Sequence, residues 1–192
     1  ITSRLVGSEM CIRDSSIDVK GALENDLAAA TLISSNSKQC VDSQIRFAFD
    51  GDSVLFSDSS ERIYKSKGLE AFCENESNAA EIPLDPGPFK PLLTTLHQIQ
   101  TKFDPQDCPI RTALVTARSA PAHERVIKTL RAWNVRIDES LFLGGLDKGE
   151  FLKSFEADVF FDDQQEHCAS ASEFVTTGHV PHGVANEKRT SG

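Results

Sequence analysis

The sequence predicts an α/β fold in which a mainly parallel β-sheet is flanked by helices. Two observations carry this prediction. Short segments rich in apolar, aromatic and β-branched residues alternate along the chain with longer segments of helical period. Polar or proline-rich connectors separate these segments, and the 192 residues are enough to bury one domain core. Strands that alternate with helices are typical of a parallel sheet covered by helices.

The first expected element lies within residues 16–33. A helix is expected there, with Asp18 as its N-cap, because apolar residues recur at helical spacing. Its buried face would be formed by Val19, Leu23, Leu27 and Ala30. In the alternative interpretation the stretch is split, and residues 28–33 form a short strand. A polar connector follows, and the main domain is expected to start near Val41.

The first strand of the main domain is expected at residues 45–49, where the sequence IRFAF alternates and is rich in β-formers. This strand ends at Asp50. Further short strands are expected within residues 112–116, 135–145, 157–164 and 175–187, which gives four or five strands.

Helices are expected between these strands, at residues 60–76 with an interruption at Gly68, 89–103, 120–134, 148–155 and 168–174. Residues 82–91 contain four prolines and predict a loop. Two helices show clear apolar stripes. The stripes are formed by Leu92, Leu93, Leu96 and Ile99 in one helix, and by Val126, Ile127, Leu130 and Trp133 in the other, where Arg125, Lys128 and Arg131 are expected to face water.

Composition excludes several classes of function. The net charge of −9 argues against nucleic-acid binding, which needs a basic face. No apolar run approaches the roughly 20 residues of a membrane span, and no secretory signal is visible at the start of the sequence. The five cysteines are scattered and form no CxxC pair, which favours free thiols in a reducing compartment. The histidines show no metal-ligand spacing and are expected to be structural.

Polar residues that could take part in catalysis or binding follow the predicted strands. Asp50 and Asp52 follow the first strand, Thr116 ends the second, Lys148 follows the third, and Asp162 and Asp163 end the fourth. Because the carboxyl ends of parallel strands form the usual site of an open α/β sheet, we expect these residues to lie together.

These residue types fit phosphoryl transfer. A carboxylate can attack phosphorus, and a second carboxylate can protonate the leaving oxygen and later activate water. A hydroxyl and an ammonium group can hold the phosphoryl oxygens. Several carboxylates beside a phosphate require a hard cation, for which Mg²⁺ is expected. A calcium loop at Asp50 is disfavoured, because Val54 and Leu55 stand where that loop needs an oxygen ligand and glycine.

The segments FDGDSV, LVTARS, Lys148 and VFFDD resemble the four motifs of the haloacid dehalogenase (HAD) superfamily. Longer segments, including PGPFKPLL and ADVFFDDQQEHC, resemble the cytosolic 5′-nucleotidase type I family over residues 18–187. The resemblance implies a HAD-like, Rossmann-type sheet with a small helical cap insertion at about residues 58–109. It also implies a Mg²⁺-dependent hydrolase of nucleoside 5′-monophosphates such as AMP, which works in the cytoplasm.

The resemblance also implies roles for the site residues. Asp50 would be the nucleophile and Asp52 the general acid/base. Phosphate would be bound by Thr116, Ala117, Arg118 and Lys148, and the metal by Asp50, the Asp52 carbonyl, Asp162 and Asp163. Three choices stay open at this point: Lys153 could replace Lys148, Asp163 could be the ligand instead of Asp162, and Arg118 could form a surface ion pair instead of binding phosphate. Tyr64 and Phe72 are expected in the core, with stacking on a base as the alternative.

The expected domain organisation has three parts. Residues 1–16 resemble a translated sequencing-adapter artefact, and residues 1–17 are expected to be non-native or disordered. Residues 18–40 would be a remnant helix and linker from a missing N-terminal half, and residues 41–192 the catalytic domain. A homo-oligomer would form through that missing half. The alternative functions are a HAD phosphatase for another small phosphomonoester and an inactive nucleotide-binding fragment.

Overall fold

A computed structural model describes residues 16–25, 27–33 and 44–187 and shows a six-stranded sheet in the order β1-β6-β5-β2-β3-β4. The strands are β1 (Thr31–Ile33), β2 (Ile45–Phe49), β3 (Ile110–Thr116), β4 (Glu139–Phe142), β5 (Val159–Asp162) and β6 (Thr176–His179). Strand β1 runs antiparallel to β6, whereas every other neighbouring pair is parallel. The predicted α/β class with a mainly parallel sheet is therefore confirmed.

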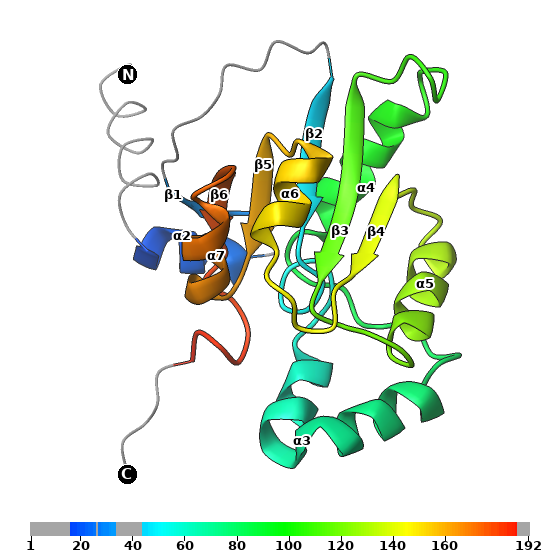
Figure 1. Ribbon diagram of the computed structural model, residues 1–192, viewed down its shortest axis with the longest axis vertical. Coiled ribbons are helices and arrows are strands. Elements are labelled where there is room, and N and C mark those ends of the chain that lie inside the picture. The colour runs from blue at the N-terminus through cyan, green and yellow to red at the C-terminus, as the bar shows by residue number, and fades with distance from the viewer. Residues whose placement is uncertain (1–15, 26, 34–43, 188–192) are drawn as a thin grey trace.

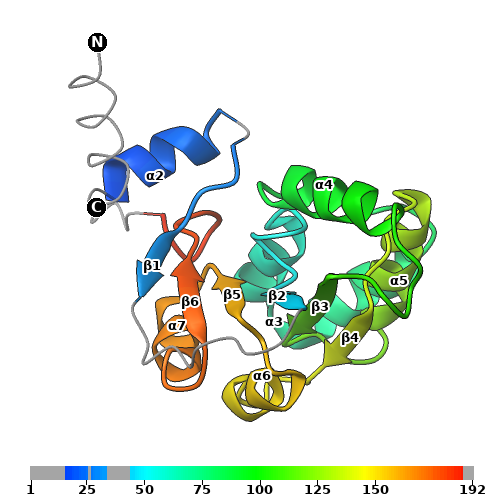
Figure 2. The same cartoon turned by 90° about the horizontal axis from the view of Figure 1, so that it is seen from above.

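Helices cover both faces of this sheet. They are α2 (Ser16–Leu23), α3 (Ser59–Asn78), α4 (Lys90–Gln100), α5 (His123–Ala132), α6 (Gly149–Phe155) and α7 (Gln165–Ala171). Figure 2 shows α2 and α4 on one face of the sheet and α6 and α7 on the other. Helix α3 differs from the others, because it lies beyond the ends of the strands, on the side to which the arrows of β2 to β5 point (Figure 1).

Alternation along the central strands builds two cores. Phe49 and Leu114 point to the face covered by α2, α4 and α5, where they join a cluster that includes Leu93 and Val126. Their neighbours in the strands point to the opposite face, where a second cluster forms under α6 and α7. That cluster contains Ala48, Ala113, Val115, Leu152, Phe155, Phe160 and Ala171. A sheet buried on both faces has no solvated side, which explains the nearly continuous apolar runs in β2 and β3.

The N-terminal helix is shorter than the favoured interpretation predicts, and the alternative with a strand is confirmed. Helix α2 ends at Leu23, and the Asn25 side chain donates a hydrogen bond to the Gly21 carbonyl at 2.7 Å, which satisfies a carbonyl of the last turn. Leu27 is 61% exposed and lines no helix face. Asp18 lies within the first turn instead of at the N-cap. Pairing of β1 with β6 decides this conformation, and no local pattern reveals that pairing.

Two predicted side-chain orientations in α4 and α5 are wrong. In α4, Ile99 is 39% exposed, while Gln100 is buried and donates a hydrogen bond to Asp138 at 2.8 Å. In α5, Arg125 does not face water freely, because it forms an ion pair with the buried Glu76 at 3.0 Å. Both errors have one cause: a polar side chain enters the interior where a distant residue satisfies its hydrogen bonds.

Helix α3 has the predicted interruption at Gly68, where φ of +84° and ψ of −178° break the helix into two segments. The predicted core position of Tyr64 is wrong, because this side chain is 50% exposed. Its ring meets the half-buried ring of Phe72 edge-on, at 6.1 Å between centroids. Helix α3 therefore presents an aromatic surface instead of burying it in the sheet core.

The proline-rich loop supports the segment that follows β2. The Gly87 N–H donates to the Leu55 carbonyl at 2.8 Å, and the Phe89 N–H donates to the Val54 carbonyl at 3.0 Å. A Cβ atom at Gly87 would lie 2.5 Å from both the Val54 and the Phe56 carbonyl oxygens. Glycine is required there, because the two backbones approach too closely for any side chain.

Several expectations fall on residues that the structure does not describe. They concern the segment 1–15, the connector 34–43 and the two cysteines within them, Cys11 and Cys40. The three cysteines in the described ranges, Cys73, Cys108 and Cys168, are free thiols, as predicted. No helix among the described residues is both long enough and apolar enough to cross a membrane.

Candidate active site

The site is built where β2 ends, in the middle of the sheet. The Asp50 N–H donates to the Phe161 carbonyl at 2.8 Å, so the backbone of the first aspartate extends the ladder between β2 and β5. Asp50 is buried, and the chain turns immediately afterwards, with the Leu55 and Phe56 N–H groups both donating to the Gly51 carbonyl. A Cβ atom at Gly51 would lie 3.1 Å from Thr116 Oγ1, so glycine lets this turn approach β3 closely.

A buried lysine links the carboxylates of two strands. Lys148 Nζ donates to Asp50 Oδ1 and to Asp162 Oδ2, each at 2.6 Å, and all three side chains are buried. Lys148 immediately precedes α6, which fixes its position beneath the ends of β2 and β5. Lys153, the other candidate, is 59% exposed, and its ammonium lies 3.8 Å from Glu150. The structure thus brings Lys148, and not Lys153, to the predicted position.

Asp163 completes a cluster of three carboxylates. Oxygen atoms of Asp50, Asp162 and Asp163 lie within 4.8 Å of one another, and all three residues are buried. Both Asp163 carboxylate oxygens are buried without a hydrogen-bond partner. Buried acceptors of this kind are rare unless a ligand satisfies them, and a set of carboxylate oxygens suits a hard divalent cation. These residues therefore fit a metal ion.

The electrostatics of the cluster reflect the crowding of charge. Burial raises the pKa of Asp50 to about 7, although the Lys148 ammonium acts to lower it. Burial, reinforced by the charges of Asp50 and Asp162, raises the pKa of Asp163 to about 9. Burial would also raise the pKa of Asp162, but Lys148 and His167 outweigh it and hold this pKa low, at about 2. A bound cation would favour the charged form of all three carboxylates.

The three residues at the end of β3, Thr116, Ala117 and Arg118, differ in burial and in their hydrogen-bond partners. Thr116 is buried, and its Oγ1 accepts a hydrogen bond from the Arg118 N–H at 3.3 Å. Ala117, between them, is exposed at the carboxyl edge of the sheet. The Arg118 side chain does not lie on the surface, because it is buried and bonds the Asp52 carboxylate with two nitrogens, Nε at 2.8 Å and Nη2 at 2.7 Å.

Two residues of the site have no counterpart in the sequence-based prediction. Glu76 of α3 is buried and contacts Arg118 Nη1 at 2.5 Å. Its helix shows no apolar period, so the sequence carries no signal that one of its many polar residues is buried. His167 lies 3.4 Å from Asp162, and its spacing after VFFDD, at the start of α7, was the available signal. Among the other described histidines, His97, His179 and His182 bond backbone groups. The His123 ring instead meets the Phe142 ring edge-on.

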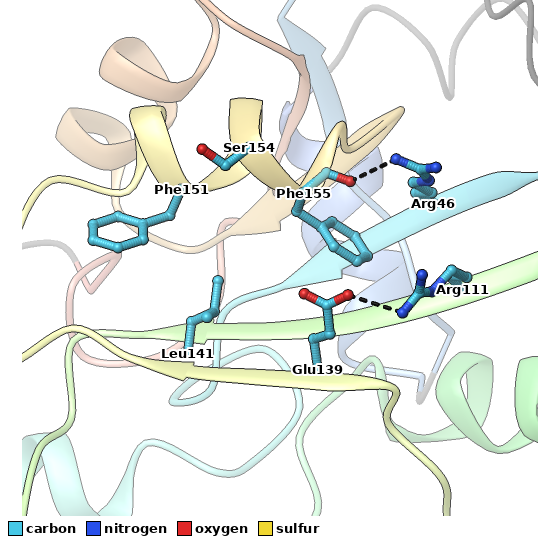
Figure 3. A pocket seen from close by; sticks show the side chains of 7 residues that line it. All are labelled: Arg46, Arg111, Glu139, Leu141, Phe151, Ser154 and Phe155. Atoms are coloured by element: carbon cyan, nitrogen blue, oxygen red, sulfur yellow. Dashed lines mark hydrogen bonds and ion pairs between the residues drawn. The ribbon is translucent and has the colours of Figure 1, made fainter.

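A separate hollow lies at the opposite end of the strands. Figure 3 shows it between α6 and the strands β2, β3 and β4, with Arg46, Arg111 and Glu139 from the amino-terminal ends of the strands. Its volume is about 280 Å³. Two arginines at its rim are engaged in bonds: Arg46 donates to the Phe155 carbonyl at 3.0 Å, and Arg111 donates to Glu139 at 2.9 Å. This hollow is distinct from the acidic cluster, which occupies the carboxyl edge of the same sheet.

Comparison with known proteins identifies the family. A family model described as 5′-nucleotidase matches residues 8–187. Human cytosolic 5′-nucleotidase 1B is 43% identical over 159 residues, which cover 80% of this chain and 26% of the human protein. The chain thus spans about a quarter of the length of this curated relative. No solved structure gives a significant match. The chain therefore belongs to the 5′-nucleotidase family, a family of phosphoric monoester hydrolases, and within it to the cytosolic type I group.

Proposed function

We propose that this chain carries the catalytic centre of a Mg²⁺-dependent 5′-nucleotidase, which hydrolyses nucleoside 5′-monophosphates such as AMP to nucleoside and phosphate. The observation that carries the proposal is the buried arrangement of Asp50, Lys148 and Asp162, with both oxygens of Asp163 left without a partner. Family membership and the relative named cytosolic 5′-nucleotidase 1B support the nucleotide substrate and a cytoplasmic location.

The reaction proceeds through a phosphorylated aspartate. A carboxylate oxygen of Asp50 attacks phosphorus, and the bond between phosphorus and the ester oxygen breaks. The electron pair stays on the leaving 5′ oxygen, which takes a proton from Asp52. Asp52 then removes a proton from water as the water oxygen attacks the phosphorus. The bond between phosphorus and Asp50 breaks, and phosphate and the free carboxylate are released.

The phosphoryl oxygens need positive or hydrogen-bonding groups as their charge redistributes. Lys148 supplies a buried ammonium beside Asp50, and Thr116 supplies a hydroxyl across the turn at Gly51. Ala117 is exposed at the same edge of the sheet, and its backbone N–H is a further proposed donor. Arg118 is the remaining expected phosphate ligand, and it also contacts Asp52 and Glu76.

Mg²⁺ would be held by the side chains of Asp50, Asp162 and Asp163, with the Asp52 carbonyl as the fourth ligand that the HAD resemblance implies. When bound, the ion neutralises the carboxylates and the substrate phosphate, so that a dianion can enter the acidic cluster. Without a cation the three carboxylates repel both one another and the substrate. The partnerless oxygens of Asp163 support this assignment.

The cap is proposed to be α3, because α4 belongs to the core. Leu93 and Leu96 of α4 pack on the sheet, whereas α3 lies across the carboxyl edge where the site opens (Figure 1). The exposed ring of Tyr64 and the adjoining Phe72 offer a surface on which a base could stack. Assembly through residues outside this chain, as a homo-oligomer, is part of the same proposal.

The proposed function is tested by phosphate release from AMP with Mg²⁺, using the chain and its Asp50→Asn variant. Release by the chain alone, stopped by EDTA and restored by Mg²⁺, is expected. Equal release by both proteins would remove Asp50 as the nucleophile. A panel of sugar phosphates and other phosphomonoesters tests the alternative substrate class. If the folded chain and its variant both release nothing, while a longer protein that contains this chain is active, the chain is an incomplete catalytic unit.

A further inference from the structure

We infer that Arg118 is a positioning residue for Asp52, and that Glu76 of α3 holds Arg118 in place. This inference rests on the proposed function, because it assigns the means by which the general acid/base is oriented. Asp52 lies on the turn after β2, Arg118 follows β3, and Glu76 belongs to a helix beyond the ends of the strands. Arg118 forms an ion pair with each of the other two, so these contacts connect the cap candidate α3 to the reacting centre.

The contact between Arg118 and Asp52 fixes orientation as well as charge. Arg118 Nε donates to Asp52 Oδ2 at 2.8 Å, and Nη2 donates to Oδ1 at 2.7 Å. Two parallel bonds between a planar guanidinium and a carboxylate restrain the rotation of the carboxylate. Each Asp52 oxygen accepts one of these bonds and keeps a lone pair on which a proton can be carried. The two hydrogen bonds from Arg118 therefore orient the Asp52 carboxylate and leave it able to carry a proton.

Glu76 has the features of an anchor. Its side chain is fully buried, and it accepts hydrogen bonds from Arg118 Nη1 at 2.5 Å, Arg125 Nη1 at 3.0 Å and Ser60 Oγ at 2.8 Å. A buried carboxylate is unfavourable unless charged and polar partners surround it. Burial acts to raise the pKa of Glu76, but attraction to Arg118, the bond from Ser60 and attraction to Arg125 outweigh it and lower the pKa. Glu76 is thus a fixed negative charge that holds the far side of Arg118.

Helix α3 holds the same guanidinium at a second point. Arg118 lies over the ring of Phe72, with the guanidinium carbon 5.4 Å from the ring centroid. Phe72 and Glu76 are four residues apart and therefore share one face of the helix. The two contacts together fix the plane of the guanidinium. They also fix the direction of its Nε and Nη2 atoms, which point at Asp52.

A phosphate ligand would show a different effect on kinetics than a positioning residue. Loss of a phosphate ligand weakens substrate binding and raises KM. Loss of a positioning residue leaves the substrate in place but misdirects the proton transfer, so it lowers kcat. Misplacement by about 1 Å can reduce a rate by on the order of 10²-fold. The inference therefore predicts a reduced kcat with little change in KM.

The experiment compares Glu76→Gln and Arg118→Lys with the parent chain and with Glu74→Gln as the matched control. Glu74 lies on the same helix but is exposed. For AMP, kcat is expected to fall by about 10- to 100-fold in the two test variants, with KM within about threefold. The first turnover of p-nitrophenyl phosphate is expected to change by less than about threefold, because its leaving group departs as a stable anion and needs no proton from Asp52.

Three results would overturn the inference. Equal losses with AMP and in the first turnover of p-nitrophenyl phosphate would indicate general damage to the fold. A raised KM with unchanged kcat would make Arg118 a phosphate ligand. Activity equal to that of Glu74→Gln would mean that Glu76 has no part in orienting Asp52. If Glu76→Gln does not fold, Glu76→Asp takes its place, because it keeps the charge while shortening the reach to Arg118.

A measurement without turnover separates this inference from the proposed function. In ¹⁵N–¹H spectra, the Arg118 Nε–H is expected to exchange slowly with water in the parent chain and in Glu74→Gln. Exchange is expected to be fast in Glu76→Gln and in Asp52→Asn, which each remove one charged partner. Slow exchange in Glu76→Gln would refute the anchor even in an inactive chain. Absence of turnover in a chain with the expected exchange pattern would contradict the proposed function alone.

Discussion

Replacement of Lys148 by Met gives the most direct test of the charge balance in the site. The Lys148 ammonium is buried between Asp50 and Asp162 at 2.6 Å from each. Methionine has a similar length and no charge, so the change removes both ion pairs without opening a large cavity. Lys153→Met is the matched control, because Lys153 is 59% exposed on the following helix and was the other candidate in the sequence.

The expected magnitude follows from the two contacts. Removing one partner of a buried ion pair destabilises a protein by about 3–5 kcal/mol. For a chain of this size, a loss of about 3 kcal/mol lowers Tm by roughly 6–12 °C. The loss of one preorganised group that stabilises the transition state reduces kcat by about 10²- to 10³-fold, or about 2.7–4 kcal/mol. Lys153→Met should stay within about 0.5 kcal/mol of the parent chain.

Phosphate release from AMP and unfolding in urea, both with and without Mg²⁺, provide the measurements. Added Mg²⁺ is expected to recover part of the lost stability in Lys148→Met, because the ion supplies positive charge to the same carboxylates. It should not recover the rate, since the ammonium also holds the phosphoryl group in the proposed reaction. Retention of at least half of the parent activity by Lys148→Met, or an equal loss in Lys153→Met, would refute this reasoning.

Two further predictions concern buried carboxylates. Glu76→Gln should lower the free energy of unfolding by about 3 kcal/mol at neutral pH, measured in urea against Glu74→Gln. Because the pKa of Glu76 is lowered from 4.5 in the folded chain, its contribution is complete above that pH and is lost as the pH falls. The difference between parent and variant should therefore shrink below pH 4.5, and a constant difference would contradict the assignment. Separately, Mg²⁺ at 100 times its Kd should add about 2.7 kcal/mol of stability to the parent chain. Asp163→Asn should be more stable than the parent without Mg²⁺ and show little shift with it; an undiminished shift would exclude Asp163 as a ligand.

Much of the fold could be predicted because its signals are local. The strand IRFAF and the buried runs of β3 and β5 carry alternation or continuous apolar character, and each is visible within a few residues. The interruption at Gly68 also has a local cause, since glycine adopts the positive φ found there. The end of α2 has no such signal, because it depends on the pairing of β1 with a strand near the other end of the chain.

The candidate site shows the same division. Asp50, Lys148 and Asp162 could be predicted as neighbours, because each ends or follows a strand and parallel strands end at one edge of the sheet. Glu76 could not be predicted, because a glutamate in a polar helix is exposed by default. Its partners Arg118 and Arg125 lie 42 and 49 residues further along the chain.

The sequence by itself determined the order of strands and helices from residue 45 onward, the residues at the carboxyl edge and the type of chemistry that they suit. Those properties depend on residue type and short-range spacing. The tertiary structure decided which charged groups are brought together: Arg118 with Asp52 and Glu76, and Lys148 with two aspartates. A charged side chain is buried favourably only where an opposite charge pairs with it. That pairing is fixed by the packing of segments far apart in the chain.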